Sequence, residues 1–185
     1  MITLLKAEKR STRKQRSERK RHPFRTILWL MLAVLLWIVI IWSFSAQSYQ
    51  QQNIQPWLHK LSQKVHIGFT LPDVQFTYSG YEYSLKQRPY AFVEFLFRKT
   101  AHLFVYAILA ILVYAGLRYK RVRAMKCIAA ALMVVVIIGS MDEYIQQFSP
   151  NRTSSVRDVG VDFIGGCFGI AIYTGIRAVR GRKPR

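Results

Sequence analysis

Four long apolar segments constrain this 185-residue chain more than any other feature. A helix needs about 20 residues to cross the roughly 30 Å hydrocarbon core of a bilayer. Each segment reaches that length together with its flanking aromatic, Ser, Thr or Gln residues. A soluble chain would need four helices that are apolar on every side, with little amphipathic surface left over. The sequence therefore predicts an all-α integral membrane bundle of four transmembrane helices, at about 27–44, 100–117, 127–141 and 159–176.

Basic residues are concentrated on one side of this four-pass arrangement. Of the 28 Lys and Arg residues, ten lie in residues 1–25 and five lie in each of 118–126 and 177–185. Only two of the nine acidic residues, Glu8 and Glu18, lie on that side. Because cytoplasmic loops of membrane proteins carry an excess of Lys and Arg, we expect both termini to be cytoplasmic.

The net charge of +19 fits a membrane protein better than a nucleic-acid-binding protein. A soluble nucleic-acid-binding domain carries its charge as a patch on a folded surface, whereas here the charge lies in loops and chain ends. We expect residues 1–25 to adhere to anionic membrane lipids; nucleic-acid binding by this segment is the minor alternative. The predicted organisation is a basic segment (1–25), a membrane domain (26–180) with an external loop at about 45–94, and a basic tail (181–185).

Eight polar residues lie where three of the apolar segments end. Ionisable groups at membrane depth are costly, so several at one level indicate a functional site. Two acids at a helix C-terminus also oppose the helix dipole, and such violations of local preference tend to mark functional sites. The second segment adds a tyrosine, Tyr106, on the same helical face as its Lys and His. The eight residues are Lys99, His102, Asp142, Glu143, Gln146, Arg152, Asp158 and Asp162.

Structural explanations remain open for several of these residues. His102 near a helix end is commonly no more than hydrogen-bonded, and acids at 142–143 are compatible with an ordinary helix exit into water. Asp158 follows Ser155 by three residues, a capping-box spacing that predicts a helix start near residue 156. Asp162 lies one turn deeper, so it needs a partner among Arg152, Lys99 and His102, or a bound proton.

Small residues in the last segments are interpreted as packing positions. Gly165 and Gly169 have the small-xxx-small spacing that lets two membrane helices approach closely. Cys127 and Cys167 are interpreted as small apolar core residues at different depths, so we expect no disulfide between them. Because the chain has only two cysteines and the polar cluster has only one histidine, we expect no metal site. We also expect no cofactor.

The external loop carries two local patterns. Trp57, Leu58, Leu61 and Val65 recur at helical spacing, which indicates a short amphipathic helix on the membrane surface. Apolar and polar residues alternate on both sides of a Ser-Gly pair at 79–80, which predicts a β-hairpin. The aromatic residues of this region form either a cap packed over the helices or a lid over the polar site.

The order of these motifs resembles the VanZ-like family of small bacterial membrane proteins. The resemblance rests on Lys99-x-x-His102-x-x-x-Tyr106, Asp142-Glu143-x-x-Gln146, Pro-Asn-Arg152 and Asp158-Val159, and on Phe-Ser-Ala-Gln at 44–47. It covers about residues 27–176 and implies a multi-pass protein of the bacterial cell membrane. One departure is Asp162, where the family pattern usually has Asn, so this chain has an additional carboxylate at the site.

Three functions fit the polar cluster. The first is a non-catalytic site that binds or masks an envelope lipid, a lipid-linked precursor or an amphiphilic antibiotic; the family's namesake is associated with reduced susceptibility to teicoplanin, but a shared fold does not transfer that role. The second is an enzyme modifying an envelope lipid or precursor, with His102, Asp142, Glu143 and Asp158 as acid–base groups. The third is a buried network that only stabilises the bundle. In the first two, the ligand contacts come from Lys99, Arg152, Gln146, Tyr106 and Asp162.

Overall fold

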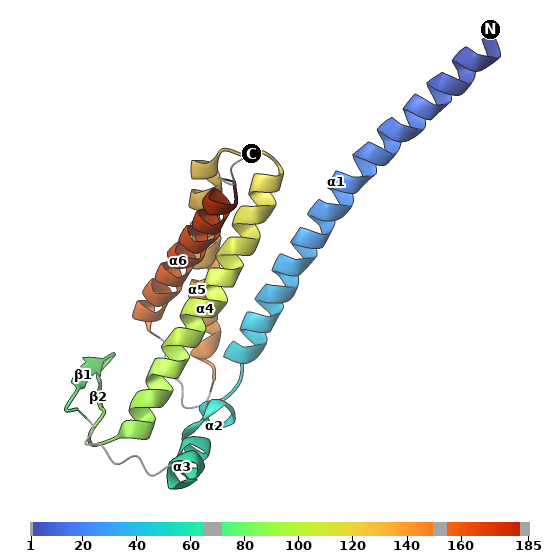
Figure 1. Ribbon diagram of the computed structural model, residues 1–185. Helices are drawn as coiled ribbons and strands as arrows, with labels where there is room; N and C mark the ends of the chain where they lie inside the picture. The colour runs from blue at the N-terminus through green and yellow to red at the C-terminus, as the bar shows by residue number, and fades with distance from the viewer. Residues whose placement is uncertain (1, 65–71, 150–154, 182–185) are drawn as a thin grey trace.

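The computed structural model describes residues 2–64, 72–149 and 155–181. The fold is mostly helical, with one two-stranded hairpin (Figure 1). The elements in chain order are α1 (Ile2–Ser45), α2 (Tyr49–Gln52), α3 (Gln55–Lys64), β1 (Gln75–Tyr78), β2 (Tyr81–Ser84), α4 (Pro89–Tyr119), α5 (Ala124–Gln146) and α6 (Val156–Gly181).

Four of these helices are long and apolar enough to cross a membrane, which confirms the predicted number of spans. These candidate spans are Phe24–Ser45, Pro89–Tyr119, Ala124–Gln146 and Val156–Arg180. The hairpin, α2 and α3 lie at one end of the bundle, and the C-terminal end of α6 lies at the other end (Figure 1). The cytoplasmic placement of the termini stays a prediction from the charges.

Helix α4 begins eleven residues earlier than the apolar segment at 100–117, so the predicted start of this helix was wrong. Pro89 occupies the first turn, where its missing N–H costs nothing. The charged residues that follow are compatible with a helix because Glu94 and Arg98 form an i,i+4 ion pair of 2.8 Å. The 31 residues span about 46 Å at 1.5 Å per residue, more than the roughly 30 Å of hydrocarbon. Lys99 and His102 therefore lie about three turns inside the helix.

Helices α4 and α6 pack with their backbones in contact. A Cβ atom at Gly165 would lie 2.5 Å from the carbonyl oxygen of Leu103, and one at Gly169 would lie 2.5 Å from that of Ala107. The interpretation of these two glycines as a close-packing motif is confirmed. Because α5 returns the chain to the end where α4 starts, α4 and α6 run in the same direction (Figure 1).

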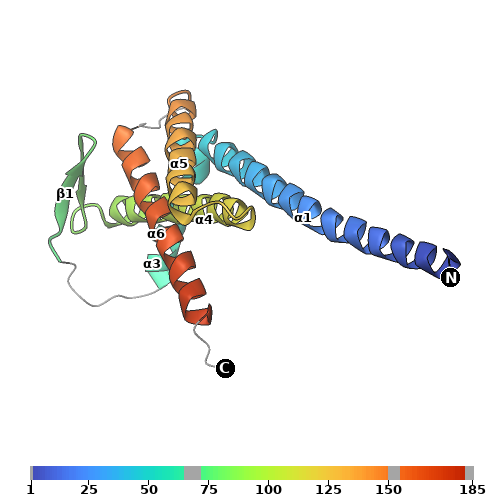
Figure 2. The same ribbon diagram turned by 90° about the horizontal axis from the view of Figure 1, so that it is seen from above.

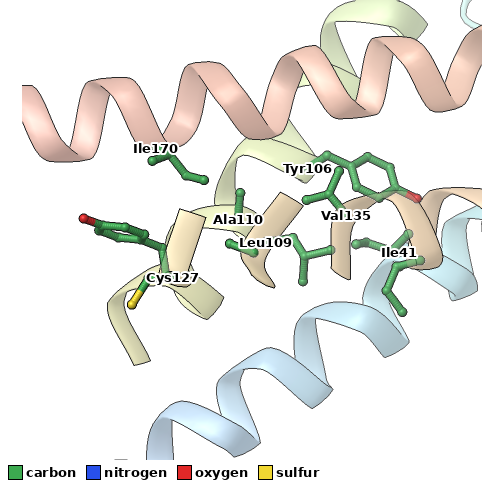
Figure 3. Close-up of a cluster of buried hydrophobic side chains, with 10 residues drawn as sticks. Ile41, Tyr106, Leu109, Ala110, Cys127, Val135 and Ile170 are labelled. Atoms are coloured by element: carbon green, nitrogen blue, oxygen red, sulfur yellow. The ribbon is translucent and has the colours of Figure 1, made fainter. Parts of the chain in front are cut away.

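The apolar core lies between α4, α5 and α6, with Ile41 added from α1 (Figure 3). Leu109, Ala110, Ala131 and Val135 are fully buried there. Cys127 also belongs to this core. Cys167 does not: its side chain is exposed on the outer surface of α6, so its interpretation as a core residue was wrong.

In the described part of the chain, helix α1 packs against the bundle near its C-terminal end. It packs against the core through half-buried Val34, Trp37, Ile38 and Trp42, and the Trp37 indole N–H donates to the carbonyl oxygen of Val105 in α4 at 2.9 Å. Its N-terminal part projects away from the other helices in both views (Figures 1 and 2). Only 6% of its apolar window is buried, against 22–28% in the other three spans.

The hairpin has the predicted turn and packs against α4. Strands β1 and β2 pair antiparallel, from Gln75 opposite Ser84 to Tyr78 opposite Tyr81. Ser79 and Gly80 both have positive φ, at 50° and 83°, as two-residue hairpin turns require. The Tyr83 ring lies 4.3 Å from that of Phe95 in α4.

Helix α3 confirms the helical pattern expected in the external loop. Trp57 and Leu61 are exposed on it, as an amphipathic surface helix requires, while Val65 lies outside the described residues. Its other face contacts the first turn of α4, where Ser62 and Tyr90 share a hydroxyl hydrogen bond of 2.8 Å. Contact of α3 with the membrane surface stays a prediction.

Candidate functional site

Two polar pairs connect α4 to α6. Lys99 forms an ion pair with Asp158, and His102 Nδ1 lies 2.9 Å from Asp162 Oδ1. Lys99 and His102 are three residues apart on α4, and Asp158 and Asp162 are four residues apart on α6. Each helix therefore presents its two polar residues on one face. Of the three partners considered for Asp162, the described part of the chain identifies His102.

Helix α5 adds an acid and an amide behind these pairs. Gln146 Nε2 donates to Asp142 Oδ2 at 2.9 Å, and it also reaches the Ser45 hydroxyl at the end of α1, at 3.4 Å. Asp142 lies within electrostatic range of Tyr106, His102 and Asp162. Asp142 and Gln146 are 1% and 4% exposed, which argues against the alternative of an ordinary helix exit into water.

Glu143 closes the gap between α5 and α6. Its Oε2 accepts the backbone N–H of Ser155 at 2.7 Å, while the Ser155 hydroxyl accepts the N–H of Arg157 at 3.3 Å. The predicted helix start at Val156 is therefore confirmed, but Asp158 does not cap it, because that carboxylate binds Lys99 instead.

Two carboxylate oxygens at this level are buried without a hydrogen-bond partner among residues 2–64, 72–149 and 155–181. They are Oε1 of Glu143 and Oδ2 of Asp162. Gly139 makes room for Asp162, since a Cβ there would lie 2.9 Å from Oδ2. Arg152, which the sequence assigned to this cluster, lies outside the described residues. Buried unpaired acceptors are costly, so they identify places where a proton, a water molecule or a ligand donor would be stabilised.

The hairpin contributes a residue that sequence reasoning missed. Tyr78 donates to Asp158 Oδ1 at 2.5 Å, the oxygen that also binds Lys99, and the Lys99 ammonium lies 4.5 Å from the centre of the Tyr78 ring. Burial, followed by the hydrogen bond to Asp158, raises the pKa of Tyr78 above its ordinary value. The Ser79 and Ser155 hydroxyls bond at 2.8 Å and complete this attachment.

A second network connects α2 and α3 to α4, and it too was missed. Glu94 is 3% exposed and accepts from Arg98 at 2.8 Å, from Gln55 at 2.6 Å and from the Tyr49 hydroxyl at 3.1 Å. Burial, with the Glu94 charge next, raises the pKa of Tyr49. The available sequence signal was an acid inside an apolar stretch with an Arg four residues later.

A polar cavity of about 330 Å³ lies between the hairpin and the start of α4. Its wall combines three cations with four tyrosines, three acids and His102. Ion pairs in this wall remain partly accessible, since the side chains of Arg98 and Lys99 are 27% and 19% exposed. The cations and tyrosines are Arg88, Arg98, Lys99, Tyr49, Tyr78, Tyr81 and Tyr83.

The structure brings the predicted residues together in two layers. Four of them line the cavity, namely Lys99, His102, Gln146 and Asp158. Three others, Tyr106, Asp142 and Asp162, are buried behind that wall, and Glu143 joins the layers through Ser155. The geometry thus offers cationic and phenolic groups to a ligand, backed by buried carboxylates that hold the histidine.

The comparisons with known proteins agree with this arrangement. The family model described as VanZ/LLP1 matches residues 29–177, which contain the polar cluster, the hairpin and nearly all of the four apolar helices. No curated protein and no solved structure matches significantly. The chain belongs to the VanZ/LLP1 family of membrane proteins.

Proposed function

We propose that this protein binds the polar headgroup of an envelope lipid or lipid-linked precursor at the outer face of the membrane and thereby sequesters or masks it. The observation that carries the proposal is the cavity wall, where Arg98 and Lys99 lie beside tyrosine rings and remain partly accessible. Phosphate and carboxylate groups are bound by such cations through charge-assisted hydrogen bonds. An amphiphilic antibiotic with an acidic group would meet the same contacts, and a role in glycopeptide resistance is part of this proposal.

The distribution of charge supports an outer location for the cavity. The cavity lies at the end of the bundle that carries the hairpin and α3, opposite the C-terminal end of α6 (Figure 1). The basic loop at 118–126 and the last turns of α6, which carry Arg177 and Arg180, lie at the other end (Figure 1), which the positive-inside rule assigns to the cytoplasm.

A deletion strain complemented with single variants tests the proposal. Lys99→Ala removes a cation from the cavity wall, so we expect it to behave like the deletion in envelope lipid composition and in susceptibility to a glycopeptide. Lys86→Ala is the matched control, because Lys86 is exposed on the same external segment and lies outside the cavity wall. Both proteins must accumulate to wild-type levels. Full complementation by Lys99→Ala would contradict the proposed binding site.

One observation favours an enzyme as the second candidate. His102 lines the cavity, and its Nδ1 is held by the buried carboxylate of Asp162 at 2.9 Å. A histidine oriented in this way by a carboxylate can act as a general base through its other nitrogen. The proposed acid–base set is then His102 with Asp142, Glu143 and Asp158.

Lipid composition separates binding from catalysis. If the protein is an enzyme, His102→Gln should retain the ligand contacts of the cavity but accumulate an unmodified envelope lipid that the wild type consumes. If the protein only binds, His102→Gln should change the amount of free ligand without changing which lipid species are present.

A further inference from the structure

A second cavity, of about 510 Å³, lies between α1 and α4. We call it the α1–α4 groove. Its walls are mostly apolar, and most of the contributing side chains belong to membrane-spanning parts of both helices. Those that carry the argument are Trp37, Ile40, Phe44, Ala101 and Val105.

The groove is amphipathic along its length. Its inner part extends from Trp37 to Phe44, about 10 Å at 1.5 Å per residue. Trp37 closes the wall at that end by donating to Val105. Beyond the end of α1, the rim is formed by side-chain amides, those of Gln47, Gln51, Gln52 and Asn53. A ligand that fits has a hydrocarbon part at the depth of the helices and polar groups at the level of the rim.

The groove is continuous with the polar cavity. Arg98 and His102 belong to the walls of both. The Arg98 side chain is 27% exposed, and its Nη2 is paired with Glu94. A phosphate or ester oxygen at this junction would accept from the accessible part of the guanidinium.

We propose that the α1–α4 groove holds one hydrocarbon chain of a membrane phospholipid, with the phosphate or ester oxygens of that lipid at Arg98 and its headgroup in the polar cavity. The inference deepens the proposed function and rests on it. A second protein helix is a poor occupant, because its diameter with side chains is about 10–12 Å. Binding sites for single small ligands have volumes of about 300–1,000 Å³, a range that includes the groove. Because α1 is mostly exposed along its apolar window, lipid reaches the groove directly from the bilayer.

Photolabelling in nanodiscs tests this directly. The full chain is placed in phosphatidylcholine nanodiscs that contain a small fraction of phosphatidylglycerol with a diazirine in its acyl chain. We expect label on the peptides that carry Ile40 and Val105, in competition with excess unlabelled phosphatidylglycerol. Ile40→Trp fills the groove and should lower that label about tenfold, since a filled pocket excludes its ligand.

The neighbouring residue provides the matched control. Val39 is 57% exposed on α1 and does not line the groove, so Val39→Trp should leave groove labelling unchanged. Ala101→Phe obstructs the groove from α4 and should reproduce the loss if Ile40→Trp does not fold. Label spread evenly around α1, or equal groove labelling in all folded variants, would overturn the assignment. The complementation assay with Lys99→Ala tests the polar cavity separately. A wrong assignment of the groove is therefore distinguishable from a wrong proposed function.

Discussion

The two sides of α4 pack in opposite ways. Toward α6 the backbones touch, at Gly165 and Gly169, and the polar pairs of Lys99 and His102 lie in line with that contact. Toward α1 the contact includes the Trp37 hydrogen bond and leaves a cavity of about 510 Å³. The difference teaches that one helix can hold acid and base groups in fixed positions on one side and leave space for a ligand on the other.

The largest expected effect comes from disrupting the backbone contact between α4 and α6. Gly169→Leu would place a side chain where Ala107 backbone atoms lie 2.5–2.9 Å from the first carbon, so we expect α6 to separate from α4 and the protein not to accumulate in the membrane. Gly175→Leu in the same helix is the control, because a Cβ atom at that position would have no neighbouring atom within 4 Å in the described part of the chain. Membrane abundance and thermal unfolding measure both. Wild-type stability of Gly169→Leu would contradict the close contact.

Asp162→Ala should have the next largest effect. It removes a fully buried carboxylate and the partner of His102, and breaking a buried pair costs about 3–5 kcal/mol. Lys99→Ala should cost less, because Lys99 is partly exposed and Asp158 keeps its bond from Tyr78. The measurement is the free energy of unfolding in mixed detergent. An Asp162→Ala protein that is stable but inactive would place this residue in the ligand site rather than in the supporting structure.

A substitution in the contact between α1 and α4 should change the free energy of unfolding only weakly. Trp37→Phe removes the indole donor to Val105 and keeps most of the apolar contact, so we expect a loss of about 0.6 kcal/mol, the average for side-chain hydrogen bonds within membranes. The same unfolding assay measures it. A loss as large as that of Asp162→Ala would mean that α1 is held as firmly as α6.

The smallest expected effect is the pH dependence of the hydrogen bond by which Tyr78 docks the hairpin. Because the pKa of Tyr78 is raised by burial and by Asp158, its phenol should stay neutral as the pH passes its ordinary value of 10.0. The contribution of this bond to hairpin docking is fully present below pH 10 and is lost as the pH rises through the raised pKa. Nuclear magnetic resonance of labelled tyrosine, with Tyr78→Phe to assign the signal, measures the titration. Ionisation of Tyr78 at pH 10 would contradict its burial.

Much of the helical framework could be predicted because it depends on local patterns. Four apolar stretches, the Ser-Gly hairpin, the start of α6 and the glycine spacing all follow from neighbouring residues. The start of α4 was missed because Glu94 and Arg98 interrupt the hydrophobicity, while in three dimensions Gln55 and Tyr49 satisfy that acid.

The composition of the site could be predicted, but its pairings could not. Depth and helical face indicated that Lys99, His102, Asp158 and Asp162 converge. Which cation meets which carboxylate depends on the register of α6 against α4, and the contact of Tyr78 depends on how the hairpin is placed. Neither is a property of any local stretch of sequence.

Asp158 Oδ1 serves two donors, the Lys99 ammonium and the Tyr78 hydroxyl. A ligand anion that attracts Lys99 changes the strength with which the remaining donor is held, so occupancy of the cavity and docking of the hairpin are thermodynamically linked. Linkage is reciprocal: any external contact that lifts the hairpin changes the affinity of the cavity by the same factor. If the proposed ligand binds at Lys99, this one oxygen atom connects the position of the hairpin to the affinity of the cavity.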